Sequence, residues 1–188
     1  MFPPPARHHL NQALRTLRGG GVIACPTEAV WGLSCDPFDE DAVERLLLLK
    51  DRPVEKGLIL VAASEAQLAF LLDSLEPQQR ETLSRTWPGP ATWLVPHGGR
   101  VPQWVSGVHT TVALRVSDHP VVRAICEAFG GPLVSTSANP GGARPARALF
   151  QVHNYFNDAV DFVLPGRLGA SGRPTVIRDL ASGEVIRA

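Results

Sequence analysis

Apolar and polar residues follow one another along this chain in patterns that predict both helices and strands. Leu10, Ala13, Leu14 and Leu17 recur at helical spacing, and three consecutive glycines follow them. Short apolar runs that stop at proline, glycine or polar residues are instead typical of buried strands. The pattern predicts helices over residues 9–17, 41–50, 64–75, 77–87, 118–129 and 147–156. It predicts strands over residues 22–25, 57–62, 91–95, 111–116, 132–135, 160–164, 175–178 and 184–186.

Residues at two of the predicted helix starts support this assignment. Asp39 precedes the second helix as a candidate N-cap, and Lys50 ends it where the helix dipole favours a cation. Ser64 and Gln67 have the spacing of a capping box. Because helices and strands alternate irregularly, we expect one α/β domain over residues 1–188, with a mixed sheet flanked by helices. The proline-rich residues 1–7 are expected to form a flexible N-terminus.

Composition agrees with a folded domain and excludes other classes of protein. The chain has 188 residues, of which 44% are hydrophobic, so it can bury a substantial core. Its longest apolar runs are far shorter than the ~20 residues of a membrane span. The N-terminus has no basic region followed by an apolar stretch, so we expect no secretory signal and a cytoplasmic location. Three cysteines without metal-type spacing are expected to be reduced and buried.

Charge is balanced overall but unevenly distributed along the chain. Eighteen basic residues match eighteen acidic ones, yet residues 28–44 carry six acids and no Lys or Arg, whereas residues 82–117 carry three Arg and no acid. If the later basic segments share a face, that face would suit phosphates; acids from elsewhere in the fold could equally neutralise it. Sixteen of the basic residues are Arg, and the only two lysines, Lys50 and Lys56, lie within seven residues.

Common catalytic and nucleotide-binding signatures are absent from the sequence. It contains no GxxxxGK[ST], GxGxxG, GxSxG or HExxH pattern. Four other segments contain more polar and charged side chains than folding alone would require. Two of them, 26–33 and 135–142, follow buried strands, where ligands gather in α/β sheets. Thr27 could instead simply cap a short helix, and the second segment could be an ordinary polar turn.

The other two segments place cations close to predicted strands. Lys50, Arg52 and Lys56 could bind a polyphosphate or form a solvated loop. Arg115 lies within a strand, on the face opposite its apolar residues. If enclosed, that guanidinium needs an anionic partner, which could be a substrate carboxylate or an acid of the protein.

Taken in order, these segments resemble the YrdC/TsaC family of threonylcarbamoyl-adenylate synthases. The resemblance rests on PTEAVWGL (26–33), KDRPVEKGLIL (50–60), WPGPATW (87–93), TVALRV (111–116), STSAN (135–139) and PTVIRD (174–179). It covers essentially the whole chain, and the combination of motifs is far more specific than any one of them. Trp31 departs from the family pattern, as does the Pro140-Gly141-Gly142 that follows the STSAN motif.

The resemblance implies a YrdC-like twisted mixed sheet with a concave basic surface, and a nucleotidyltransferase activity. L-threonine, bicarbonate or carbon dioxide, and ATP with Mg²⁺ would give threonylcarbamoyl-AMP and pyrophosphate. A threonylcarbamoyl-transferase complex of the TsaD/TsaB/TsaE type would then modify the adenosine beside the anticodon of tRNAs that read codons beginning with A. No membrane partner is expected. The alternatives are a non-catalytic module that binds tRNA or double-stranded RNA, and a carbamoyl-adenylate domain from a hydrogenase-maturation carbamoyltransferase.

The resemblance also implies which residues bind each substrate. No protein nucleophile and no protein metal ligand is expected, because the carbamate itself attacks ATP while Lys50 and Arg52 neutralise phosphate charge. The expected L-threonine contacts are Thr27, Arg115, Ser135 and Thr175. The expected ATP contacts are Lys50, Arg52, Lys56, Thr111, Ser137, Asn139 and Arg187.

Overall fold

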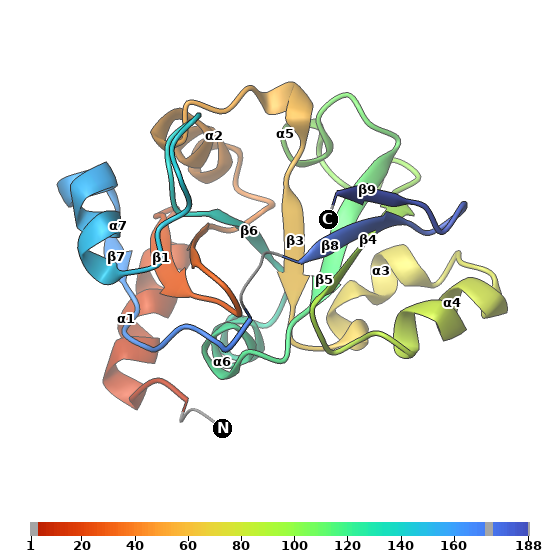
Figure 1. Cartoon of the computed structure of the whole chain (residues 1–188), viewed down its shortest axis with the longest axis horizontal. Coiled ribbons are helices and arrows are strands. Elements are labelled where there is room, and N and C mark those ends of the chain that lie inside the picture. The colour runs from red at the N-terminus through yellow and green to blue at the C-terminus, as the bar shows by residue number, and fades with distance from the viewer. Residues whose placement is uncertain (1–3, 172–174, 188) are drawn as a thin grey trace.

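A single mixed sheet is the centre of the molecule (Figure 1). The computed structural model describes residues 4–171 and 175–187, and within these ranges nine strands pair in the order β7-β1-β2-β6-β3-β5-β4-β8-β9. Three neighbouring pairs, β1–β7, β3–β5 and β4–β8, are parallel, and the others are antiparallel. The expected mixed α/β sheet is therefore confirmed. The strands are β1 (Ile23–Pro26), β2 (Trp31–Ser34), β3 (Ile59–Ala62), β4 (Ala91–Pro96), β5 (Thr111–Val116), β6 (Leu133–Ser137), β7 (Phe162–Val163), β8 (Val176–Asp179) and β9 (Val185–Arg187).

Helices cover both faces of this sheet. On one face α1 (Arg7–Arg18) and α6 (Pro120–Phe129) pack through Leu17 and Ile125 against residues of β1 and β3. The larger core lies on the other face and buries the apolar sides of the remaining helices. Those helices are α2 (Glu40–Leu49), α3 (Ala69–Leu72), α4 (Pro77–Ser84), α5 (Gln103–Ser106) and α7 (Leu149–Phe156). Short 3₁₀ turns occupy η1 (Val54–Lys56), η2 (Glu65–Leu68) and η3 (Asn157–Ala159).

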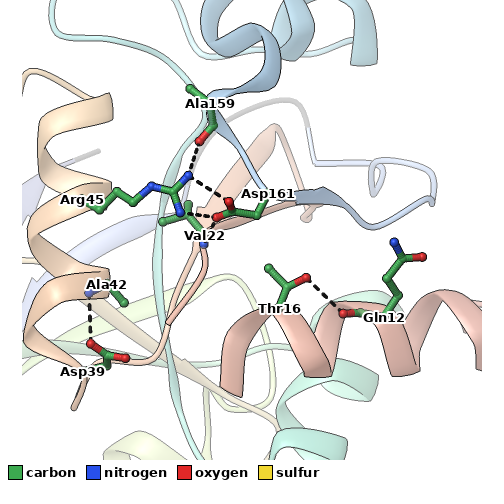
Figure 2. Close-up of polar contacts among 8 residues, drawn as sticks. All are labelled: Gln12, Thr16, Val22, Asp39, Ala42, Arg45, Ala159 and Asp161. Atoms are coloured by element: carbon green, nitrogen blue, oxygen red, sulfur yellow. Dashed lines mark hydrogen bonds and ion pairs between the residues drawn. The ribbon is translucent and has the colours of Figure 1, made fainter. Parts of the chain in front are cut away.

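The start of α2 and its attachment to the sheet are set by polar side chains (Figure 2). Asp39 caps the helix as predicted, its carboxylate accepting from the Ala42 amide at 3.1 Å. One turn later, Arg45 forms a two-point ion pair with Asp161, whose carboxylate also accepts from the Val22 amide at 2.8 Å. These contacts join α2 to the segments that carry β1 and β7.

Three local predictions need correction. Ser64 makes no side-chain cap; Gln67 instead accepts from the Ala63 amide at 2.8 Å and donates to the Cys126 carbonyl at 2.8 Å, and only a 3₁₀ turn forms there. The strand expected over 132–135 continues to Ser137, because Gly32 and Leu33 of the unpredicted β2 pair with its last residues. Arg7 of the expected flexible segment already begins α1, and residues 1–3 lie outside the described ranges.

Candidate functional site

A cavity of about 350 Å³ opens where β1 and β6 end and β2 and β3 begin, beside the loop after α2 and the C-terminal strands. Ten of the eleven expected substrate contacts line it, although they come from segments throughout the sequence. These residues are Thr27, Lys50, Arg52, Lys56, Arg115, Ser135, Ser137, Asn139, Thr175 and Arg187. The sheet therefore brings the separately predicted segments to one place.

Thr111 is the expected contact that the structure does not place in the cavity lining. It begins β5, beside Pro96 of β4. Because strand residues alternate between faces, Thr111 shares a face with Arg115 but lies ~13 Å away along the strand. A role for its hydroxyl in binding ATP stays a prediction.

Lys50 joins two of the motif segments. Its buried ammonium donates to the main-chain carbonyls of Ser137 and Asn139, to the latter at 2.8 Å. In the opposite direction, the Gly141 amide donates a hydrogen bond to the main-chain carbonyl of Lys50 at 2.7 Å. Burial lowers the pKa of Lys50 to about 8, and the charge of Arg52 adds to the shift. Lys50 thus holds this wall of the cavity in place. Its ammonium has three N–H donors, and these two hydrogen bonds use two of them.

Arginine side chains continue the positive wall. Arg52 donates to the Gly57 carbonyl at 2.7 Å, and burial together with the charge of Arg187 lowers its pKa. Arg187 lies on β9 and is exposed as a whole residue. Burial of its charged group and the charge of Arg115 nevertheless lower its pKa. Arg187 therefore lies within electrostatic reach of both Arg52 and Arg115, and this group of cations favours a multiply charged anion.

The other two arginines of the basic segment 82–117, Arg85 and Arg100, do not line this cavity. Arg85 pairs with Glu81 at 2.6 Å, and Arg100 donates to the Ser74 hydroxyl at 2.9 Å. The positive charge at the cavity therefore depends on particular arginines. A continuous concave basic surface, as the resemblance implies, stays a prediction.

Arg115 has an acidic partner within the protein. Its Nη1 atom lies 3.1 Å from Oε2 of Glu28, and both side chains are about nine-tenths buried, at 8% and 10% exposed. The other carboxylate oxygen, Oε1, accepts from the Ser117 hydroxyl at 2.5 Å. The strand arginine could pair with a substrate carboxylate or with an acid of the protein, and the structure shows the protein acid. Arg115 nevertheless lines the cavity as well.

Hydroxyl groups also belong to the cavity lining. Thr27 donates to the Val30 carbonyl at 2.8 Å within a turn, not a helix. The hydroxyl of Thr175 lies 2.9 Å from that of the fully buried Thr92. Ser135 is also buried and lines the cavity. Each hydroxyl oxygen keeps a lone pair for a ligand donor.

Unpaired polar atoms concentrate at this site. Within the described ranges, five buried side-chain nitrogen or oxygen atoms have no hydrogen-bond partner, and four belong to residues that line the cavity. Buried polar groups in folded proteins are normally hydrogen-bonded, so this concentration favours a ligand site. Three of the four atoms are Nε of Arg52, Nε of Arg115 and Oδ1 of Asn139; the fourth is Oε2 of Glu28, which lies in the ion pair with Arg115 but has no hydrogen-bond partner.

Comparison with known proteins agrees with this arrangement. The family model Sua5/YciO/YrdC, described as "Telomere recombination", matches residues 15–188. The chain belongs to this family. A protein named threonylcarbamoyl-AMP synthase from Stutzerimonas stutzeri is 60% identical over 95% of this chain and 96% of its own length. One of the same name from Pseudomonas putida is 58% identical, with the same coverage of both chains.

Solved structures of the Sua5/YciO/YrdC family share this fold. E. coli YciO superposes with a TM-score of 0.86 at 26% identity, covering 98% of this chain and 92% of its own. P. abyssi Sua5 complexed with L-threonine also has a TM-score of 0.86, at 30% identity, over 94% of this chain and 52% of that one.

The structure also assigns features at the Sua5/YciO/YrdC site that sequence reasoning missed or left open. Glu28 lies within the 26–33 motif, and nothing in its local sequence indicates its pairing with Arg115. Trp31 is buried in the larger core and does not line the cavity, so its departure from the family pattern affects packing. Gly141 does line the cavity, and a Cβ there would lie 3.0 Å from the Asp51 carbonyl oxygen.

Proposed function

We propose that this chain is a nucleotidyltransferase that forms threonylcarbamoyl-AMP from L-threonine, bicarbonate or carbon dioxide, and ATP. The observation that carries this proposal is about 60% identity, over nearly the whole chain, to proteins named for that activity. The cavity supports it, because a cluster of cations adjoins a buried arginine and several hydroxyls. The non-catalytic RNA-binding alternative is not favoured by these relatives.

The chemistry requires no nucleophile from the protein. The threonine amine, in its neutral form, bonds to the carbon of bicarbonate with loss of water, which gives a carbamate. A carbamate oxygen then attacks the α-phosphorus of ATP, and pyrophosphate leaves as the P–O bond breaks. The protein would contribute by holding the reactants together and by stabilising negative charge.

We propose that the two ends of the cavity divide the substrates. At the phosphate end, Arg52, Lys56 and Arg187 would contact the triphosphate, with Lys50 holding the wall formed by Ser137 and Asn139. At the other end, Arg115 would bind the threonine carboxylate, because a planar guanidinium suits a carboxylate better than an ammonium does. Thr27, Ser135 and Thr175 would face the rest of the amino acid.

Mg²⁺ would enter as the ATP complex. In the described part of the chain, no three His, Cys, Asp or Glu side chains converge to hold a metal ion. Mg²⁺ commonly keeps several waters and takes the rest of its ligands from substrate phosphates, so this site suits it when it arrives with ATP. Its chemical role would be to neutralise charge on the triphosphate.

Product hand-over is the last part of the proposal. Threonylcarbamoyl-AMP would pass to a transferase complex of the TsaD/TsaB/TsaE type for modification of the tRNA adenosine beside the anticodon, in the cytoplasm. Helices long and apolar enough to cross a bilayer do not occur among the described residues.

Product identification tests the reaction directly. The purified protein should be incubated with ATP, Mg²⁺, L-threonine and ¹³C-bicarbonate, and the nucleotides analysed by mass spectrometry. We expect an adenylate that contains both threonine and the heavy carbon. If the protein gave no such adenylate yet bound tRNA with a steep salt dependence, the RNA-binding alternative would replace this proposal.

A further inference from the structure

Five cationic side chains line the cavity, but only one of them has an acidic partner among the described residues. Lys50, Arg52, Lys56 and Arg187 have no ion pair there, whereas Arg115 pairs with Glu28. Asp51 is the other acid in the lining; it is exposed, and no ion pair to these cations is formed. The amino-acid end is therefore locally neutral, while the phosphate end keeps its positive charge.

The Glu28 carboxylate is firmly held in this position. Oε1 accepts from the Ser117 hydroxyl at 2.5 Å, and that hydroxyl in turn accepts from the His119 amide at 3.1 Å. The backbone on the other side is covered by residues 169–171, because Gly169 donates to the Thr27 carbonyl at 2.9 Å and Ser171 donates to the Glu28 carbonyl at 3.1 Å. Because Ser117 holds its carboxylate and residues 169–171 hold its backbone, Glu28 has little freedom to leave Arg115.

Without Glu28 the positive surface would extend through the whole cavity. The charge of Arg115 already reaches Arg187, and the charge of Arg187 reaches Arg52. A buried guanidinium without a counter-charge is strongly unfavourable, so it would take up whatever anion is available. Beside a nucleotide site, the most abundant and most highly charged anion is a polyphosphate.

We propose that Glu28 is a specificity-determining residue that keeps phosphate groups away from Arg115. The ion pair neutralises most of the charge of Arg115 and so disfavours a polyphosphate. A singly charged carboxylate can still bind to the guanidinium N–H groups that Glu28 does not contact. The triphosphate is thereby confined to the cations at the other end, so that the two substrates bind side by side. This inference rests on the proposed function, which assigns the two ends to the two substrates.

Glu28→Gln tests this role, because it removes the charge and keeps the shape. Pyrophosphate and a non-cleavable ATP analogue serve as probes, with threonine binding measured by calorimetry at several analogue concentrations. In the unaltered protein the analogue should not weaken threonine binding. In Glu28→Gln, pyrophosphate should bind about tenfold tighter, and the analogue at ten times its Kd should weaken threonine binding about tenfold.

Two further variants separate this role from a structural one. Asp51→Asn neutralises the exposed cavity acid without freeing Arg115, and it should not create competition between threonine and the analogue. The double variant Glu28→Gln with Arg115→Met should lose the gain in pyrophosphate affinity, because the freed guanidinium is gone. If Glu28→Gln melts too early to be studied, Ser117→Ala should give a smaller rise in pyrophosphate affinity.

Several results would overturn the inference. One is a Glu28→Gln protein in which threonine binding falls equally with and without the analogue while pyrophosphate affinity is unchanged; Glu28 would then only position Arg115. Another is a gain in pyrophosphate affinity that persists in the double variant. Failure of the proposed function is a separate result, seen as no threonine-dependent turnover in the unaltered protein, and the pyrophosphate measurements still decide the role of Glu28.

Discussion

The ammonium of Lys50 donates to the main-chain carbonyl of Asn139 at 2.8 Å and so joins the end of α2 to the segment after β6. This contact changes what the pair of lysines in the sequence means. Lys50 is a compact donor to two carbonyl oxygens, and a planar guanidinium has a different shape and donor geometry.

Replacing Lys50 by Arg should therefore impair both the wall of the cavity and turnover. We expect kcat/KM for ATP to fall by about tenfold or more, because a charge-assisted hydrogen bond is lost or distorted. Steady-state kinetics measure this, with the exposed Arg80→Lys as the control that should behave as the unaltered protein does. Full activity in Lys50→Arg would mean that any cation suffices at this position.

Alkaline pH should reveal the same residue through stability. The folded-state pKa of Lys50, about 8, is below its ordinary value of 10.5, so between these values the unfolded chain binds more protons. The Lys50 contribution to the free energy of unfolding should therefore rise with pH across this window and be lost as pH falls through 8. Urea unfolding at pH 7.5–10.5 checks this against Lys50→Met, in which the rise should be missing.

Replacing Arg115 by Ala should weaken threonine much more than ATP. Loss of charged hydrogen bonds to a carboxylate should raise the KM for threonine about 10- to 100-fold, while ATP binding changes by less than about threefold. Calorimetry with each ligand alone separates the two effects. An equal loss of both ligands would show that Arg115 is structural.

Replacing Gly169 by a residue with a side chain should destabilise the protein. A Cβ at this position would lie 2.7 Å from the Glu28 carbonyl oxygen, so Gly169→Ala must push the covering segment away from the site. We expect a loss of about 1–3 kcal/mol of stability and weaker threonine binding. Gly131→Ala, where a Cβ would meet nothing within 4 Å, is the matched control and should change neither.

Much of this architecture could be predicted from local sequence. Asp39 capped α2 as its spacing indicated, and motif residues that follow strands did meet in one cavity, because strand ends share an edge of the sheet. The short β2 was missed, since its only strand signal is four residues that include a glycine. A capping box at Ser64 was wrong, because Gln67 found a tertiary partner in Cys126.

The electrostatic detail of the site could not be predicted in the same way. Ser117 and Glu28 are 89 residues apart, and only the fold shows that their hydrogen bond positions the acid beside Arg115. Long-range pairing of this kind leaves no periodic or local trace in a single sequence. For the same reason, the sequence indicated a phosphate ligand for Lys50, whereas its hydrogen bond to the Asn139 carbonyl is seen only in the structure.

The most direct test of the account is pyrophosphate release from ATP by the purified protein, with Mg²⁺ and bicarbonate present, measured with and without L-threonine. We predict steady release in the complete mixture and none above background when threonine is omitted. Release that continues without threonine, or no release in the complete mixture, would contradict the proposed function.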